Sequence, residues 1–123
     1  MFLYPVRGIK GFEVPFLKMT ESGAEFDRLW VIVNSKTLDF RNLTKCDKTI
    51  QFESQYIWEQ ETPVTLRISC RGESIDVPLE REYHQKDYFE GKKNNCGYRE
   101  RLEVNQFLTK HMGYDVMLLR SKP

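Results

Sequence analysis

Two arginines stand out in this sequence because each lies inside or at the end of a predicted strand, beside apolar neighbours. Arg7 follows Tyr4-Pro5-Val6, and Arg28 precedes Leu29-Trp30. A guanidinium held by a rigid sheet can bind phosphate or carboxylate through two parallel hydrogen bonds. Both arginines are therefore candidates for an anion receptor. The alternative is that each pairs with a local acid or lies on a solvated face.

Other residues able to carry chemistry are not arranged for catalysis. The sequence has no G-x-S-x-G, H-E-x-x-H or C-x-x-C motif, and no glycine-rich loop followed by Lys and Ser or Thr. The cysteines lie far apart and are expected to be free thiols, and the histidines are expected at the surface or at helix caps. These residues are Cys46, Cys70, Cys96, His84 and His111. The sequence therefore predicts no catalytic or metal-ligating residue, and we expect no enzyme activity from this chain on its own.

The composition is typical of one globular domain. The chain has 123 residues, of which 40% are hydrophobic, 13% aromatic and 30% charged. This is enough apolar bulk to close one core, and the length is too short for two cores of normal size. A single domain is therefore expected over residues 1–123.

The charge pattern argues against nucleic acid as a partner. Nineteen Lys and Arg stand against eighteen Asp and Glu, and these cations are scattered among acids rather than gathered along one segment. No apolar run reaches the roughly 18 residues that a membrane-spanning helix requires, and no leader segment is recognisable. We therefore expect protein partners, no nucleic acid and no direct membrane insertion. An intracellular location is expected, cytoplasmic or mitochondrial.

The first half of the chain predicts β-strands. β-branched and aromatic residues with glycine breaks indicate strands at Phe2 to Arg7, Glu13 to Met19 and Phe26 to Val33. The last of these ends in an apolar run, which indicates an interior strand covered on both faces. A turn at Asn34 then leads to a return strand at Thr37 to Phe40. Two short apolar patches follow, Ile50 to Phe52 and Tyr56 to Trp58, and either could be an edge strand.

The second half predicts a hairpin, one helix and a final strand. Apolar and polar residues alternate over Val64 to Ile68 and again over Ser74 to Leu79. Tyr88-Phe89 is a candidate short strand. Helical spacing over Tyr98 to Met112 predicts an amphipathic helix, with Phe107 and Leu108 buried against the strands and a final strand over Tyr114 to Leu119. The fold class is therefore mainly β (α+β): a twisted antiparallel sheet or partly closed β-barrel with one C-terminal amphipathic helix followed by a final strand.

Two sequence motifs resemble one known family. Leu3-Tyr4-Pro5-Val6-Arg7-Gly8 is similar to a Y-P-V-K-S opening, and Gly23-Ala24-Glu25-Phe26-Asp27-Arg28-Leu29-Trp30 is similar to G-L-x-x-D-R-x-W before an apolar strand. Through these motifs the chain resembles the MOSC N-terminal β-barrel domain family. The order and spacing continue through the Val64 to Leu79 hairpin to Gly113-Tyr114-Asp115-Val116. The resemblance covers nearly the whole chain.

The resemblance implies a molybdenum cofactor bound between this domain and a following MOSC domain, whose cysteine holds the metal. It assigns the phosphate end of the pterin to the basic residue of Y-P-V-K-S, the serine beside it and the arginine of D-R-x-W. These positions fall on Arg7, Gly8 and Arg28, and Gly8 has no hydroxyl. The family's T-x-R motif is altered to Asp39-Phe40-Arg41. No cysteine here matches the metal ligand, so we expect no cofactor bound to the chain alone.

The same resemblance leaves two functions open. The chain ends at Pro123, where the catalytic MOSC half would begin. The first function is a non-catalytic MOSC N-terminal-type module, acting as an accessory or structural subunit or as an interaction domain of a larger assembly. The alternative is an N-terminal fragment of a molybdenum-cofactor enzyme, of the amidoxime reductase or cofactor sulfurase type, that supplies a cradle for the cofactor phosphate.

Overall fold

The computed structural model describes residues 1–21, 23–38, 51–91 and 96–121. Strands make up most of its regular structure, which confirms the mainly β class. The strands are β1 (Phe2–Leu3), β2 (Val6–Arg7), β3 (Phe12–Glu13), β4 (Met19–Thr20), β5 (Gly23–Ala24), β6 (Trp30–Asn34), β7 (Phe52–Glu59), β8 (Thr62–Cys70), β9 (Glu73–Pro78), β10 (Tyr88–Glu90), β11 (Cys96–Arg99) and β12 (Val116–Arg120). The helices within the described ranges are the 3-10 helix η2 (Gln85–Asp87) and the α-helix α2 (Leu102–Met112).

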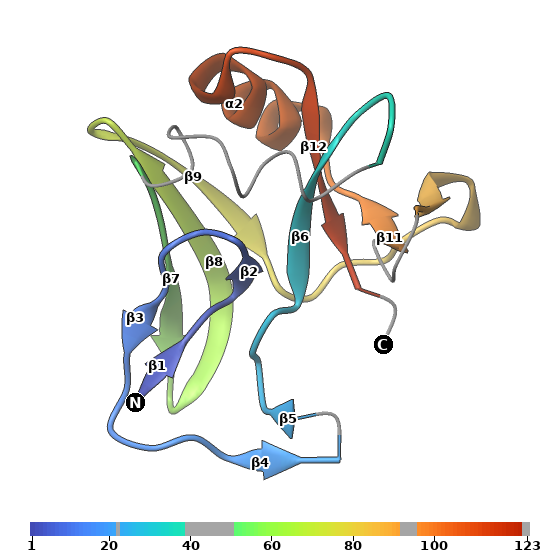
Figure 1. Ribbon diagram of the computed structural model, residues 1–123. Helices are drawn as coiled ribbons and strands as arrows, with labels where there is room; N and C mark the ends of the chain where they lie inside the picture. Colours follow the sequence, from blue (N-terminus) through green and yellow to red (C-terminus); the bar gives the residue numbers. More distant parts are fainter. Residues whose placement is uncertain (22, 39–50, 92–95, 122–123) are drawn as a thin grey trace.

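A five-stranded sheet carries the N-terminal motifs. Its strand order is β10-β11-β12-β6-β2 (Figure 1), with β2 parallel to β6 and the other pairs antiparallel. Residues 30–33 of β6 are all buried, because Trp30 and Ile32 belong to the main core while Val31 and Val33 belong to a smaller apolar cluster. The predicted interior strand, covered on both faces, is confirmed.

A second, antiparallel sheet consists of β7, β8 and β9. Its alternating pattern directs Leu66, Ile68 and Cys70 of β8 into the core, where all three are buried. The predicted hairpin is confirmed, with Gly72 in its turn at φ +81°. The two apolar patches before the hairpin form the single strand β7, and Ile50 lies outside the described residues.

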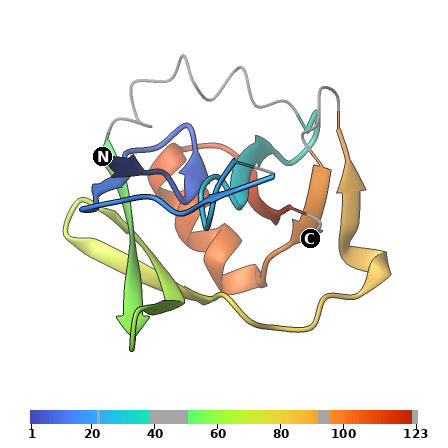
Figure 2. The same ribbon diagram turned by 90° about the horizontal axis from the view of Figure 1, so that it is seen from below.

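The helix α2 packs against β12 and β9, between the two larger sheets (Figures 1 and 2). Val104, Leu108 and Met112 recur at helical spacing and are buried. Gly113 ends the helix in the left-handed conformation, with φ +86°, and its N–H donates to the O atom of Thr109 at 2.9 Å. The amphipathic helix and the final strand after it are therefore confirmed.

The predicted start of the helix, at Tyr98, was too early. Residues 96–99 form β11 instead, because they pair with β10 on one side and β12 on the other. Inside the helix Leu108 is fully buried, whereas Phe107 is only half-buried at the edge of the core. The burial expected for Leu108 is confirmed, whereas that expected for Phe107 is only partial.

The N-terminal strands are shorter than predicted. The strand expected from Phe26 begins at Trp30, because positive φ angles at Phe26 (+67°) and Arg28 (+51°) turn the chain before it. The strand expected over Phe2 to Arg7 is divided into β1 and β2. The strand expected over 13–19 is wrong except at its ends, where β3 and β4 lie in separate two-stranded sheets.

The turn at Asn34 is confirmed, but its return strand is not. The Oδ1 atom of Asn34 accepts hydrogen bonds from the N–H groups of Lys36 and Thr37 at 2.9 and 3.2 Å, and residues 37–38 are not strand. Residues 39–40 lie outside the described ranges. Over the residues that the structure describes, the separate sheets do not close into a complete barrel. Within the part of the chain that the structure describes, neither helix has the length and apolar character to cross a membrane.

Candidate functional site

Arg7, Gly8 and Arg28 line one open pocket of about 400 Å³, which we call the basic pocket. The structure therefore brings the three predicted site residues together. Its remaining lining residues are Tyr4, Ile9 and Lys10. Three of these six residues are cationic and none is anionic, so the lining favours a negatively charged ligand.

Backbone hydrogen bonds hold the two motifs side by side. The N–H of Arg28 donates to the O atom of Tyr4 at 2.6 Å. The strand β2 then runs parallel to β6, with Arg7 opposite Val31. Because these contacts bring the two motifs side by side, Arg7 on β2 and Arg28 in the bend before β6 line the same pocket.

Asp27 fixes the position of Arg28. Its Oδ2 atom accepts a hydrogen bond from Nη1 of Arg28, and its Oδ1 atom accepts one from the N–H of Tyr4 at 2.8 Å. The guanidinium carbon lies 5.4 Å from the centre of the Tyr4 ring. The local ion pair considered as an alternative is thus present at Arg28. Because a guanidinium carries five N–H donors and this side chain is 56% exposed, further donors are available to a ligand.

Lys10 is a pocket residue that the sequence did not identify as part of the site. Its backbone O atom accepts hydrogen bonds from the N–H and Oγ of Ser54, at 2.8 and 2.9 Å, which attaches the loop after β2 to β7. Its Nζ atom lies 3.5 Å from Oε1 of Glu53, and both side chains are exposed. The sequence offered one clue that Lys10 belongs to the site, which is that this basic residue lies three positions after Arg7.

Gly8 has a backbone conformation that explains why no serine stands there. Its φ of +92° lies in the left-handed region, where a Cβ atom causes strain. The turn after β2 therefore favours glycine over the serine implied by the family pattern. The altered motif over residues 39–41 lies outside the described residues.

The comparisons with known proteins agree with these motifs. Residues 1–115 match the family model described as "MOSC N-terminal beta barrel domain". This chain belongs to the MOSC N-terminal β-barrel domain family. Over 128 residues it is 26% identical to molybdenum cofactor sulfurase of Danio rerio, an alignment that covers 100% of this chain and 15% of that protein. No solved structure matches the chain significantly.

In this MOSC N-terminal domain a buried carboxylate holds the tryptophan of the second motif. The side chain of Glu100 has no exposed surface. It accepts hydrogen bonds from Nε1 of Trp30 at 3.0 Å, Nη1 of Arg81 at 2.8 Å and the hydroxyl of Tyr83 at 2.5 Å. Burial, together with the bond to this carboxylate, raises the pKa of the Tyr83 phenol. Glu100 falls within the helix predicted over Tyr98 to Met112, so the sequence did not reveal this cluster.

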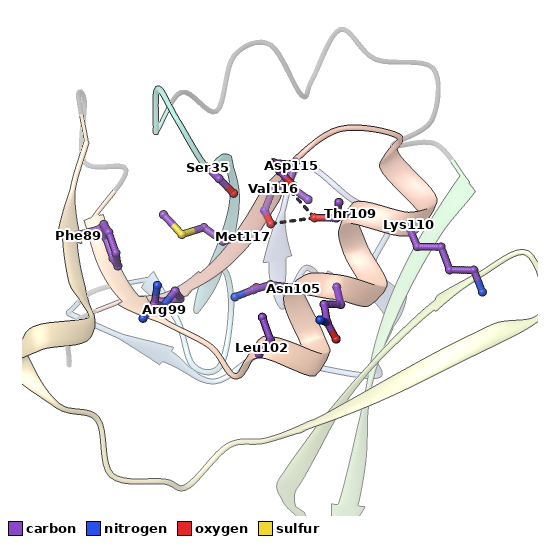
Figure 3. A pocket seen from close by; sticks show the side chains of 11 residues that line it. Ser35, Phe89, Arg99, Leu102, Asn105, Thr109, Lys110, Asp115, Val116 and Met117 are labelled. Atoms are coloured by element: carbon purple, nitrogen blue, oxygen red, sulfur yellow. Dashed lines mark hydrogen bonds between the residues drawn. The ribbon is translucent and has the colours of Figure 1, made fainter.

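Another pocket, of about 500 Å³, lies beside α2 (Figure 3). Its cationic residues are Arg99 and Lys110, and each already has an anionic partner. Nη2 of Arg99 lies 3.0 Å from Oδ1 of Asp87, and Nζ of Lys110 lies 2.9 Å from Oε1 of Glu73. The figure shows Arg99 and Lys110 on opposite sides of the pocket.

Arg28 and Lys10 of the basic pocket are paired as well, with Asp27 and Glu53. The basic pocket is still the better candidate for an anion, because three cations and no anion line it, whereas Asp115 also lines the pocket beside α2.

The histidines differ in their surroundings. His84 is exposed, as expected. His111 is only 4% exposed, which corrects the surface position expected for it, because its ring packs 4.7 Å from that of Phe107 and 6.2 Å from that of Phe52. Its Nε2 atom lies 3.3 Å from Oε1 of Glu73.

The described thiols are Cys70 and Cys96, and both are free. Burial raises the pKa of the Cys70 thiol, which favours its neutral form. Cys46 lies outside the described residues. Among the residues that the structure does describe, His, Cys, Asp and Glu side chains form no group of three or more that could hold a metal ion.

Proposed function

We propose that this domain forms the phosphate-binding part of a molybdenum cofactor site. The observation that carries the proposal is the single pocket lined by Arg7 and Arg28, the two basic positions of the family motifs. The name of the related sulfurase connects the family with this cofactor. The chain spans 15% of that relative's length. Any catalytic activity of a complete protein that contains this domain is therefore part of the proposal.

The donors of the basic pocket fit a phosphate group. A phosphate monoester near pH 7 carries almost two negative charges and three acceptor oxygens. Arg7 and Arg28 would donate charge-assisted hydrogen bonds to those oxygens, and Lys10 would add a third positive charge. Because the pocket is open, the rest of the ligand could extend away from this domain.

The role of this chain would be to bind and orient, not to react. When bound, the cofactor would supply the molybdenum centre for sulfur transfer or for the reduction of N-hydroxylated substrates. The ion pair with Asp27 would position Arg28, and the parallel β2–β6 pairing would position Arg7. The metal ligand would come from a second domain, as the family pattern implies.

A calorimetric titration tests the proposal. A pterin monophosphate is titrated into the wild-type chain and into Arg7→Ala, Arg28→Ala and Arg67→Ala. Arg67 is the matched control, because it pairs with Asp76 at 2.8 Å on the other sheet. We expect each pocket variant to bind about tenfold more weakly and the control to bind as the wild type does. Equal binding by all four proteins would refute the phosphate site.

The accessory or interaction role is a second candidate function, and a different observation favours it. Large apolar side chains are exposed on this domain, Phe16 at 74% and Trp58 at 42%. Exposed apolar residues gathered in one patch mark a binding surface, whereas apolar residues scattered singly are common on any protein surface. The two functions are compatible, because the apolar residues do not line the basic pocket.

A further inference from the structure

A concave surface separate from the basic pocket lies between the β3–β4 connection and the β7–β8 turn. This apolar pocket has a volume of about 640 Å³, and its apolar lining includes Leu3, Phe12, Phe16, Phe26 and Trp58. Figure 1 shows the β3–β4 connection crossing from β3 to β4 below the hairpin sheet. The pocket is large enough for one or two side chains of a partner.

The floor of the apolar pocket is fixed by an aromatic cluster around Tyr56. Its ring lies edge-on to those of Phe12, Phe26 and Trp58, at 5.7, 6.3 and 6.0 Å between ring centres. Its hydroxyl donates to the backbone O atom of Phe26 at 2.5 Å. The floor therefore exists before any ligand binds, which lowers the entropic cost of binding.

The wall of the pocket is held at both ends by backbone hydrogen bonds. The N–H of Val14 donates to the O atom of Met1 at 2.8 Å, and the N–H of Glu25 donates to the O atom of Lys18 at 2.7 Å. The segment between these bonds carries Phe16, whose ring is 74% exposed. A large apolar group is thus presented to solvent by a fixed backbone.

The rim of the apolar pocket is acidic. Glu13, Glu25 and Glu61 line it together with one cation, Lys18, whose Nζ atom lies 3.7 Å from Oε2 of Glu25. Neither Glu13 nor Glu61 forms an ion pair with another described residue. Glu61 is exposed and sits in the β7–β8 turn, with φ +71°. Two carboxylates therefore face solvent beside an apolar cavity, without a positive partner among the described residues.

We infer that the apolar pocket binds a segment of another protein in which an aromatic or aliphatic side chain lies next to lysine or arginine. The side chain fills the cavity beside Phe16 and Trp58, and the cation pairs with Glu13 or Glu61. An anionic membrane surface does not fit, because the rim carboxylates would repel it. The inference does not depend on the phosphate site, since the two pockets share no lining residue.

The test uses the full chain and a fluorescein-labelled peptide, Lys-Lys-Leu-Phe-Lys-Lys, followed by fluorescence anisotropy. Two matched peptides replace every Lys by Glu, or Leu-Phe by Ser-Ser. We expect the basic apolar peptide to bind at least about tenfold more tightly than either. Its affinity should also fall as salt rises from about 0.1 M to about 1 M.

Variants of the chain locate the binding site. Phe16→Ser, Trp58→Ser and the double variant Glu13→Lys/Glu61→Lys should each lose at least about tenfold in affinity. Leu102→Ser and Glu82→Lys are the controls, because both side chains are exposed on other elements and should not affect binding. All six substituted residues are exposed, so circular dichroism should show unchanged folding.

Several results would overturn the inference. No binding of the basic peptide at millimolar concentration, equal binding of the Glu peptide, or unchanged affinity in the pocket variants would each do so. Binding of phosphatidylserine vesicles through Phe16 in place of the peptide would show a membrane surface instead. Concentration-dependent self-association that Phe16→Ser abolishes would show that the occupant is a second copy of the chain.

Discussion

The indole Nε1 of Trp30 donates a hydrogen bond to Oε2 of Glu100 at 3.0 Å, across 70 residues of sequence. The guanidinium carbon of Arg120 lies 4.5 Å from the centre of the same indole ring. These contacts anchor the first residue of β6, two positions after Arg28. The tryptophan of the family motif therefore has a structural role, which is to hold the strand that positions the arginine.

Replacing Glu100 should destabilise the domain strongly. Glu100→Leu leaves the buried donor of Trp30 and the partly buried donors of Arg81 and Tyr83 without their acceptor, which should cost about 3–5 kcal/mol in the free energy of unfolding. Glu100→Gln retains acceptor oxygen and should cost less. Glu53→Gln, which breaks an exposed ion pair, should cost under about 1 kcal/mol. Urea unfolding measures all three, and a fully stable Glu100→Leu variant would contradict this role.

Burial in the helix should decide which apolar truncation costs more. Leu108→Ala removes a fully buried side chain and should cost about 2–5 kcal/mol. Phe107→Ala removes a half-buried ring and should cost less than the about 3–5 kcal/mol of a fully buried one. Chemical denaturation of the two variants should therefore show the larger loss of stability for Leu108→Ala. A larger loss for Phe107→Ala would mean that its ring lies deeper in the core than the structure places it.

Two tyrosines should make the domain sensitive to alkali. Burial is the main cause that raises the pKa of the Tyr56 and Tyr83 phenols above their ordinary value of 10.0. The folded state therefore holds these protons more tightly than the unfolded state, so stability is complete below about pH 10 and falls as the pH rises further. Urea midpoints measured from about pH 8 to about pH 11 should show a smaller decline in Tyr83→Phe. An identical decline in wild type and variant would count against this assignment.

Restoring the family's serine at Gly8 should cost stability. The φ of +92° penalises any Cβ atom, so Gly8→Ser should lose about 1–2 kcal/mol in the free energy of unfolding. Gly8→Ala is the matched control and should lose as much, because the strain comes from the Cβ atom and not from the hydroxyl. Thermal unfolding compares them. If Gly8→Ser is as stable as the wild type, the turn accepts a side chain and the glycine needs another explanation.

The sequence predicted the parts of the fold that local patterns control. Alternation placed the β8–β9 hairpin, and helical spacing placed α2. The strand boundaries before β6 were wrong because Phe26 and Arg28 adopt left-handed conformations, which are rare for such residues and leave no trace in a hydropathy pattern. The helix start was wrong because pairing of β11 with its neighbours outweighed helical propensity.

The candidate site was predicted in its residues but not in its surroundings. Arg7, Gly8 and Arg28 share one pocket because β2 pairs with β6, a contact between segments that motif spacing does not describe. Lys10 joins them through a loop conformation, and Glu100 holds Trp30 of the second motif through tertiary packing. Such partners depend on the completed fold, so a single sequence does not reveal them.

A double-mutant cycle on Arg7 and Arg28 tests the central claim most directly. The binding free energy of a pterin monophosphate is measured for the wild type, Arg7→Ala, Arg28→Ala and the double variant. If both guanidiniums hold one phosphate in the basic pocket, the two losses should be non-additive, with a coupling energy of about 0.5–3 kcal/mol. Additive losses, or no loss in any variant, would contradict a shared phosphate site.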